Sequence, residues 1–195
     1  MKRILCLICV LAACLCLFAC GSDSDVPKGM KLASNTKVVD YKLFVPENWV
    51  VSNADRAQTQ AYVSESDRTN VIVNQWNMTE STKTVADWWE KEYKPQVFEA
   101  GAILDYAIDK NEDGTEGVNM LLGGKEAIKY TYTGRIGDAF FKYQVIGCVT
   151  NGSIYVMHIT YLQDGNEAEG EAPKFTTVET HKEAIDQIIA NFKFI

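Results

Sequence analysis

Hydrophobic and polar residues alternate with a period of two along most of the chain, and in two places the pattern changes to a helical period. Alternation predicts strands that bury one face, whereas apolar residues three and four positions apart predict amphipathic helices. The alternating segments, rich in β-branched and aromatic residues, are residues 41–45, 60–64, 70–76, 102–108, 117–122, 125–133, 139–149 and 153–161. Short turns join the later segments, so these strands are expected to be antiparallel. Asn151-Gly152 is the strongest turn signal, because both positions of a tight hairpin turn require positive φ.

The first helical segment follows Thr84. This residue can cap a helix, with Asp87 three positions later in the chain. Pro95 then removes a backbone donor and clashes with the preceding turn. Two outcomes are open: the helix ends near Tyr93, or it kinks and resumes through residues 97–98.

The second helical segment closes the chain, where Thr176 and Glu179 fit a capping box. One apolar stripe follows at helical spacing, formed by Val178, Ala184, Ile185, Ile188, Ile189 and Phe192. Such a stripe must be covered, and one face of an antiparallel sheet is its natural partner. The predicted fold class is therefore α+β, a twisted and mainly antiparallel sheet packed by two main helices.

The amino-terminal residues have the order of a secretion signal. Lys2 and Arg3 give a basic start, and residues 4–18 are apolar throughout. This run is shorter than the roughly 20 apolar residues of a membrane-spanning helix. Ala19 is the small residue before Cys20.

The residues Leu17, Phe18, Ala19 and Cys20 resemble the lipobox of bacterial lipoproteins. Phe18 departs from the small or β-branched residue that is usual at its position. The resemblance implies that residues 1–19 are a cleaved signal peptide and that Cys20 receives a diacylglyceryl thioether, often with a third acyl chain on its amine. The alternative is a plain secretory signal that is cleaved elsewhere.

A lipid on Cys20 would fix the location of the chain. One acyl chain gives reversible attachment, whereas two or more make the anchor effectively permanent. Residues 20–37, rich in Ser, Asp, Gly and Lys, are expected to form a flexible tether, and residues 38–195 a single globular domain. We expect this domain on the extracytoplasmic face of the cell membrane, with an envelope protein or a small ligand as its partner.

The domain resembles the PsbP-like proteins. The resemblance rests on a first strand that is followed by Pro46 and Trp49, a helix that carries Trp88 and Trp89, a run of long hairpins and a closing amphipathic helix. It covers residues 41–195. It implies an antiparallel sheet between helices and a non-catalytic binding or assembly module.

Composition narrows the classes of function. With 47% hydrophobic and 23% charged residues, the chain is globular in composition. The formal net charge is −7, and loss of Lys2 and Arg3 with the signal makes the mature chain more acidic. Basic residues are scattered and outnumbered, which argues against nucleic acid as a partner. Gly123-Gly124 lacks the Lys-Ser/Thr of a phosphate loop, and no cofactor is expected.

Five of the six cysteines lie in the first twenty residues, so Cys148 is the only cysteine of the domain and no internal disulfide can form. Cys148 with His158 is a candidate nucleophile and base, although both lie in predicted strands without an evident third group. His181 opens the last helix. With two histidines and one cysteine, a zinc site is hard to assemble, and structural roles are expected for all three.

An acidic turn resembles the first half of a calcium loop. Asp109, Asn111 and Asp113 stand at alternate positions and Gly114 follows them. Met120 stands where such a loop supplies its bidentate glutamate, so the match is partial, and Glu116 is the substitute in a rearranged loop. A solvated hairpin turn is the alternative.

Trp88 and Trp89 are the candidate binding surface. Neighbours on an α-helix point about 100° apart, so the two side chains cannot both face one sheet fully. We expect one to be core and the other partly exposed, where it would either bind a partner or cover an edge of the sheet.

The leading hypothesis is a membrane-tethered binding or accessory module. A surface hydrolase or isomerase is the alternative from another class, and a calcium-responsive binding protein is a third. An enzyme predicts a deep pocket lined by several titratable residues, whereas a binding module predicts a shallow apolar patch near Trp88 or Trp89.

Overall fold

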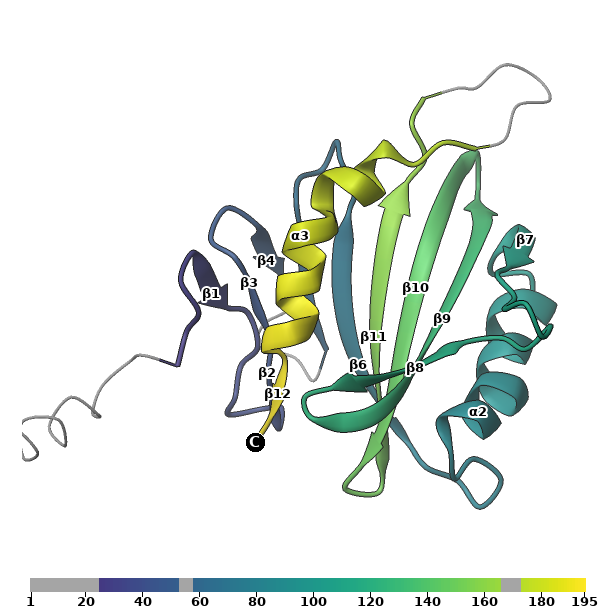
Figure 1. Ribbon diagram of the computed structural model, residues 1–195, viewed down its shortest axis with the longest axis horizontal. Coiled ribbons are helices and arrows are strands. Elements are labelled where there is room, and N and C mark those ends of the chain that lie inside the picture. Colours follow the sequence, from purple (N-terminus) through teal and green to yellow (C-terminus); the bar gives the residue numbers. More distant parts are fainter. Residues whose placement is uncertain (1–24, 53–57, 166–172) are drawn as a thin grey trace, which may run out of the picture.

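A computed structural model describes residues 25–52, 58–165 and 173–195 (Figure 1). The predicted signal peptide and Cys20 lie outside the described residues. Within these ranges, no helix has the length and hydrophobicity needed to cross a membrane.

One antiparallel sheet organises the molecule. Its strand order is β4-β5-β6-β11-β10-β9-β7, and β8 also pairs with β9. The strands are β4 (Val50–Ser52), β5 (Thr59–Tyr62), β6 (Asn70–Asn77), β7 (Leu104–Ile108), β8 (Val118–Leu122), β9 (Lys125–Ile136), β10 (Ala139–Thr150) and β11 (Ser153–Leu162). Every pair in the sheet is antiparallel, as the short turns predicted. At the β10–β11 turn, φ is 51° at Asn151 and 74° at Gly152, which confirms the expected hairpin.

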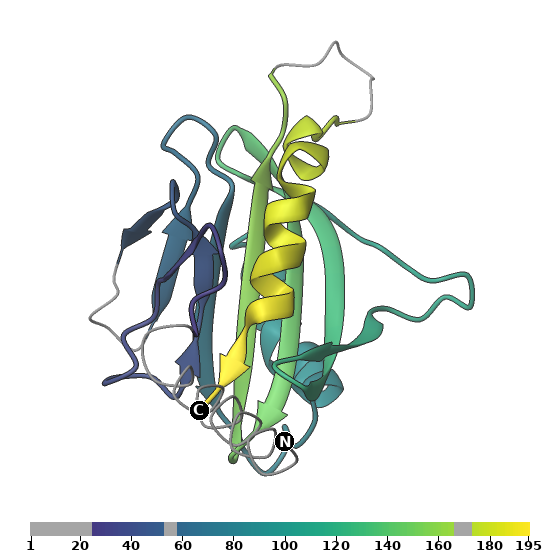
Figure 2. The ribbon, with the colours of Figure 1, turned by 60° about the vertical axis from the view of Figure 1, so that its left-hand side comes forward.

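The strands β7 and β8 share one neighbour. Both pair with β9, β8 along its first half and β7 along its second. The connecting residues 109–117, here called the tongue, are closed by a bridge between Lys110 and Glu116 and extend away from the sheet (Figure 2). The flanks of the acidic turn are thus strands, as the sequence indicated.

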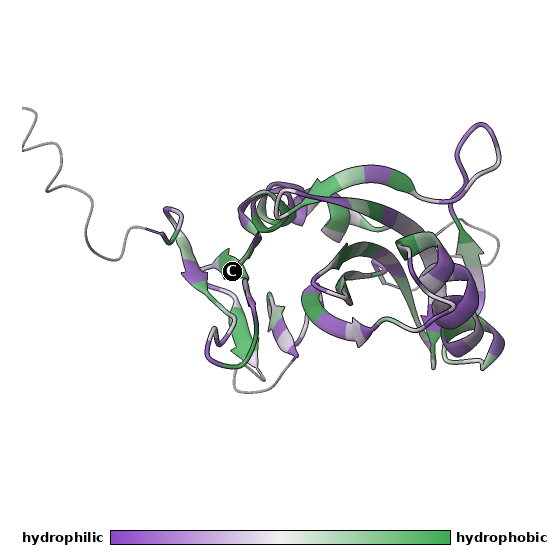
Figure 3. Cartoon of the chain, turned by 90° about the horizontal axis from the view of Figure 1, so that it is seen from below, coloured by the Kyte–Doolittle hydropathy of each residue, from purple (hydrophilic) through white to green (hydrophobic). Residues whose placement is uncertain are grey.

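The two ends of the described chain meet in a small terminal module, which we define as residues 25–46 and 193–195. In this module β1 (Met30–Leu32) pairs with β3 (Phe44–Pro46), and β2 (Tyr41–Lys42) pairs with β12 (Lys193–Phe194). The module, which includes the C terminus, lies at one end of the molecule (Figure 3). The expected tether to residue 37 is therefore too long, because Met30 and Ala33 are buried against the domain.

Two helical segments cover opposite faces of the sheet. The closing helix α3 (Thr176–Asn191) buries Ile185 and Ile188, with Phe192 beyond its end. Its predicted apolar stripe packs in a buried cluster that includes Tyr41, Ile146, Cys148 and Met157, here called the α3-side core. On the other face lie α2 (Val85–Trp88) and the π-helical turns η1 (Trp89–Tyr93) and η2 (Pro95–Glu99). They pack with the sheet in a second buried cluster that includes Trp88, Trp89, Tyr132 and Val156, here called the α2-side core. The predicted α+β fold class is confirmed.

Helical structure continues past Pro95. The π turns are wider than α turns and carry hydrogen bonds five residues apart, such as Ala100 N to Pro95 O at 2.9 Å. Pro95 stands at the first position of η2, where a missing donor is tolerated. Of the two outcomes left open by the sequence, continuation through residues 97–98 is observed.

The capping box predicted for α3 is absent. Phe175 is the N-cap residue and makes no side-chain cap. Asp164 replaces it, because its carboxylate accepts hydrogen bonds from Thr176 N at 2.6 Å and Thr176 Oγ1 at 2.8 Å. Thr84, by contrast, caps α2 as predicted and accepts from Asp87 N at 3.0 Å.

Candidate functional site

Both candidate tryptophans are buried, with exposed fractions of 0% for Trp88 and 1% for Trp89. The prediction that one of them is partly exposed is wrong. It assumed that the sheet covers only one side of the helix. Trp88 meets Trp76 of β6, whereas Trp89 stacks on Tyr130 of β9 and is covered by the tongue through Glu116, so two side chains that point in different directions are both buried.

Trp89 is held from three directions. Its ring stacks on Tyr130 with centroids 4.0 Å apart and planes at 3°, and it also stacks on Tyr93. Its Nε1 donates to Glu116 Oε2 of the tongue at 2.8 Å, and the same oxygen lies 2.9 Å from Lys94 Nζ. Trp89 therefore joins η1, β9 and the tongue into one unit.

The charges around Glu116 stabilise its ionised form. Partial burial raises the pKa of Glu116, but the hydrogen bond from Trp89 and the ammonium group of Lys94 outweigh burial and hold the pKa below its usual value. For Lys94, burial lowers the pKa, whereas Glu90 and Glu116 raise it, and the net direction is upward. An ion pair and a hydrogen bond to an ionised carboxylate thus connect the tongue to the helix.

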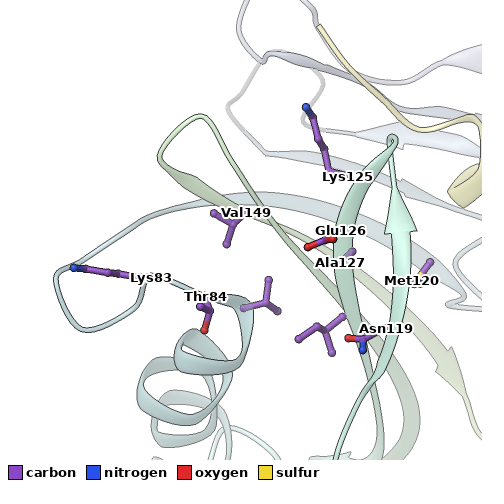
Figure 4. Close-up of a pocket in the computed structure, with 10 residues that line it drawn as sticks. Lys83, Thr84, Asn119, Met120, Lys125, Glu126, Ala127 and Val149 are labelled. Atoms are coloured by element: carbon purple, nitrogen blue, oxygen red, sulfur yellow. The ribbon is translucent and has the colours of Figure 1, made fainter.

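A groove lies next to this unit, one turn before Trp88 in the chain. It has a volume of about 600 Å³ and separates the first turn of α2 from the β8–β9 hairpin (Figure 4). Its lining residues are Lys83, Thr84, Val85, Asn119, Met120, Lys125, Glu126, Ala127, Ile128 and Val149. We call this space the α2 groove.

The walls of the α2 groove are mainly apolar and its rim is charged. Val85, Ile128 and Val149 provide aliphatic surface, while the exposed Lys83 and Lys125 start from opposite sides of the opening and extend outward into solvent (Figure 4). Such a surface suits a ligand that combines an apolar body with an anionic group.

Close backbone packing fixes the position of one wall. Gly147 on β10 faces Val85, and a Cβ at Gly147 would lie 2.6 Å from Val85 Cγ1. Only a residue without a side chain lets the first turn of α2 approach β10 this closely. The distance between α2 and β10 thus depends on Gly147, and this distance sets the position of the α2 wall of the groove.

Two polar side chains of the acidic turn, Asn111 and Asp113, are bonded within the tongue. Asp113 Oδ1 accepts from Thr115 N at 2.9 Å, and Asn111 Nδ2 donates to Gly117 O at 2.7 Å. Glu116, the substitute ligand of the calcium hypothesis, is paired with Lys94. In the described part of the chain, no cluster of three or more His, Cys, Asp or Glu side chains is suited to hold a metal ion.

Cys148 and His158 lie on opposite faces of the sheet, so they do not form a nucleophile and base pair. Cys148 belongs to the α3-side core, and burial raises the pKa of its thiol to about 11. His158 packs beside Tyr93 in the α2-side core, with ring centroids 5.7 Å apart, and burial lowers its pKa to about 4. The thiol is protonated and the imidazole neutral near pH 7.

His181 has a structural partner. Its Nε2 lies 2.7 Å from Asp67 Oδ2, and its ring meets Trp49 edge to face at 6.4 Å. The pair fastens α3 to the β5–β6 turn. Burial raises the pKa of Asp67, but hydrogen bonds from Thr69 and His181 outweigh it and give a net lowering.

Most of the α2 groove could not be identified from the sequence. Lys83 and Val149 lie 66 positions apart in the chain and become neighbours only through the packing of α2 on β10. The predicted binding surface at Trp88 and Trp89 lies on the helix that borders the groove, but the two tryptophans themselves do not line the groove. Trp76 of β6, which meets Trp88 edge to face at 5.6 Å, carried no signal beyond its strand pattern.

The described elements define a three-layered α+β fold in which an antiparallel sheet lies between two helical layers, and solved structures of this fold are known. The solution structure of cyanobacterial PsbP (CyanoP) from Synechocystis sp. PCC 6803 matches with a TM-score of 0.52 and 15% identity, over 91% of this chain and 99% of that one. The chain therefore has a PsbP-like fold.

Other solved structures match less closely. A protein from Bacteroides thetaiotaomicron gives a TM-score of 0.50 at 9% identity, over 87% of this chain and 49% of that one. LpqN, involved in cell envelope biogenesis of Mycobacterium tuberculosis, gives a TM-score of 0.46 at 13% identity, over 78% of this chain and 82% of that one. No protein-family profile and no curated protein sequence matches the chain.

Proposed function

We propose that the chain is a lipoprotein, anchored through Cys20 on the extracytoplasmic face of the cell membrane, and that its domain is a non-catalytic binding module. The α2 groove is its ligand site. The ligand class that fits is a molecule or peptide segment with an apolar body and an anionic group.

The sequence around Cys20 supports the anchor. A basic start, a short apolar run and the order Leu17, Ala19, Cys20 match a lipoprotein signal. Each buried CH₂ of an acyl chain contributes about 0.8 kcal/mol, so a diacylglyceryl group on Cys20 holds the chain at the bilayer without any membrane-spanning helix.

The observation that carries the ligand site is the pairing of aliphatic walls with two lysines at the rim of a groove of about 600 Å³. Ligand pockets in proteins commonly have volumes of about 300–1,000 Å³, a range that includes the volume of this groove. They are mostly apolar, with a few polar groups that orient the ligand. Lys83 and Lys125 are exposed, so their ammonium groups can meet an anion without displacing core residues.

Binding explains the groove better than catalysis does. The titratable side chains that line it are Lys83, Lys125 and Glu126. General acid–base and nucleophilic mechanisms need an activated group within reach of a partner that positions it. Cys148 and His158 lie outside the lining and on different faces of the sheet.

Replacement of the anchoring thiol tests the location. In cells fed a labelled fatty acid, Cys20→Ala is expected to lose the label and to leave the membrane fraction, because no other group supplies comparable hydrocarbon. Cys148→Ala is the matched control and is expected to keep both. A Cys20→Ala protein that stays labelled, or that sediments with membranes as the parent does, contradicts the anchor.

An anionic fluorescent probe tests the groove. We expect 8-anilinonaphthalene-1-sulfonate to bind the folded domain, and Lys83→Gln/Lys125→Gln to weaken binding by about three- to tenfold, since each exposed charge contact contributes about 0.2–1 kcal/mol. Val149→Trp should also weaken binding, because the larger side chain fills the groove. Lys129→Gln/Lys142→Gln, which removes the same charge from two lysines outside the lining of the groove, serves as control. Equal effects of both double variants, or no effect of Val149→Trp, would reject this site.

A further inference from the structure

The start of the described chain is fastened to the terminal module. The carboxylate of Asp25 pairs with Lys42 of β2 and, at 2.7 Å, with Lys193 of β12. These two lysines lower the pKa of Asp25 to about 2, Lys193 having the larger effect. The ammonium groups thus tie residue 25 to both ends of the domain.

Five residue steps separate Asp25 from Cys20 in the sequence. A fully extended chain advances at most about 3.6 Å per residue, so the link spans no more than about 18 Å. If Cys20 carries the lipid, as the proposed function states, this short link keeps Asp25, where the terminal module begins, within about two Debye lengths of the headgroups at physiological ionic strength.

The terminal module is basic although the chain as a whole has a net charge of −7. Its side chains include five lysines (Lys28, Lys31, Lys37, Lys42 and Lys193) and two aspartates. Among the described residues, no carboxylate pairs with Lys28, Lys31 or Lys37. Positive charge is therefore concentrated at the end of the molecule from which the anchor leaves.

Apolar side chains are exposed on the same module. Val26, Leu32, Val38 and Ile195 have exposed fractions of 42%, 41%, 49% and 59%. Lysines next to exposed apolar side chains are typical of protein surfaces that rest in the headgroup region of a bilayer. Anionic lipids attract such basic segments within a Debye length of the surface.

We propose that the terminal module docks on the anionic lipid surface to which Cys20 is attached, so that the domain is held in one orientation. The partner is a bilayer with anionic headgroups. Lys28, Lys31 and Lys37 provide the attraction, and the exposed apolar side chains of the module enter the interface. The tongue and the α2-side core lie away from the terminal module, so in this orientation they are directed away from the bilayer.

A chain that begins at Cys20 allows a direct test, because its only other thiol, Cys148, is fully buried. A maleimide with one saturated acyl chain is coupled to Cys20, and partition onto vesicles of phosphatidylcholine with 30% phosphatidylglycerol is compared with partition onto phosphatidylcholine alone. One acyl chain binds only weakly and reversibly, so a contribution from the protein surface is measurable. We expect about tenfold stronger partition onto the anionic vesicles at low salt, lost at high salt.

The decisive comparison is between two triple variants of equal charge. Lys28→Gln/Lys31→Gln/Lys37→Gln is expected to lose most of the tenfold preference, whereas Lys110→Gln/Lys129→Gln/Lys142→Gln should change it less than twofold. Circular dichroism verifies that both are folded. Equal losses in the two variants, or no preference for anionic vesicles in the parent, overturn the docking proposal. Because the lipid is attached chemically, these outcomes are independent of fatty-acid labelling in cells, which alone decides the anchor.

Discussion

The indole of Trp89 and the carboxylate of Glu116 form a contact in which each group depends on the other. Trp89 is almost fully buried, so its Nε1 needs an acceptor, and Glu116 is the acceptor 2.8 Å away. A buried donor without a partner is destabilising by about 1–3 kcal/mol, more than the contact itself contributes. The side chain at position 116 therefore decides whether the tongue stays on the helix.

Two substitutions at this position separate hydrogen bonding from charge. Glu116→Gln keeps an oxygen for Trp89 but loses the attraction to Lys94, and is expected to lower the free energy of unfolding by about 1 kcal/mol. Glu116→Ala leaves the indole donor unpaired and should lower it by about 2 kcal/mol or more. Urea unfolding followed by circular dichroism measures both, and equal values for the two variants would show that Trp89 needs no acceptor.

A comparison of the parent with Glu116→Gln is also expected to reveal a pH dependence of stability. The pKa of Glu116 is lower in the folded chain than its ordinary value, so its ionised form contributes stability above the unfolded pKa of about 4.3, and this contribution is lost as the pH falls through the folded pKa. Glu116→Gln has no such group. The stability difference between parent and variant should therefore be constant near pH 7 and shrink in acid.

At the scale of elements, the contact between α2 and β10 depends on a missing side chain. Gly147 belongs to the middle strand of the three longest hairpin strands, where a glycine weakens the strand unless close packing requires it. Here Val85 occupies the space that a Cβ would need. The first turn of the helix is thereby seated against the sheet, next to the α2 groove.

Gly147→Ala is expected to lower the free energy of unfolding by about 1–3 kcal/mol, because the added methyl overpacks this contact. Val85→Ala removes the methyl groups that it meets. The double variant should consequently be more stable than the sum of the two single effects predicts, as measured by thermal or urea unfolding. Simple additivity would mean that the helix shifts freely and that Gly147 does not set its position.

At the scale of the whole molecule, the features that the sequence predicted correctly are those that depend on residues close together in the chain. Strand periods, the Asn151-Gly152 turn and the apolar stripe of α3 are short-range patterns, and they predicted the sheet, the last hairpin and the closing helix. The sequence also predicted the cap at Thr84, because capping involves neighbours along the chain.

Long-range contacts account for what the sequence missed. Asp164 replaces the predicted capping box from twelve positions away, and the tongue buries Trp89 from 27 positions away. The early residues that were expected to be a tether gain structure by pairing β1 with β3. The site followed the same rule, since its walls come from segments that are brought together only by folding.

The pairing of β12 with β2 has a practical meaning for any fusion protein. Ile195 donates its backbone N–H to Asp40 O, and Lys193 holds Asp25, so both ends of the folded body emerge side by side. A reporter appended after Ile195 would crowd the link that leads to Cys20. An insertion between Glu112 and Asp113, in the turn at the tip of the tongue, would leave that link unobstructed, because the tongue extends from the sheet on the side opposite the terminal module (Figure 2).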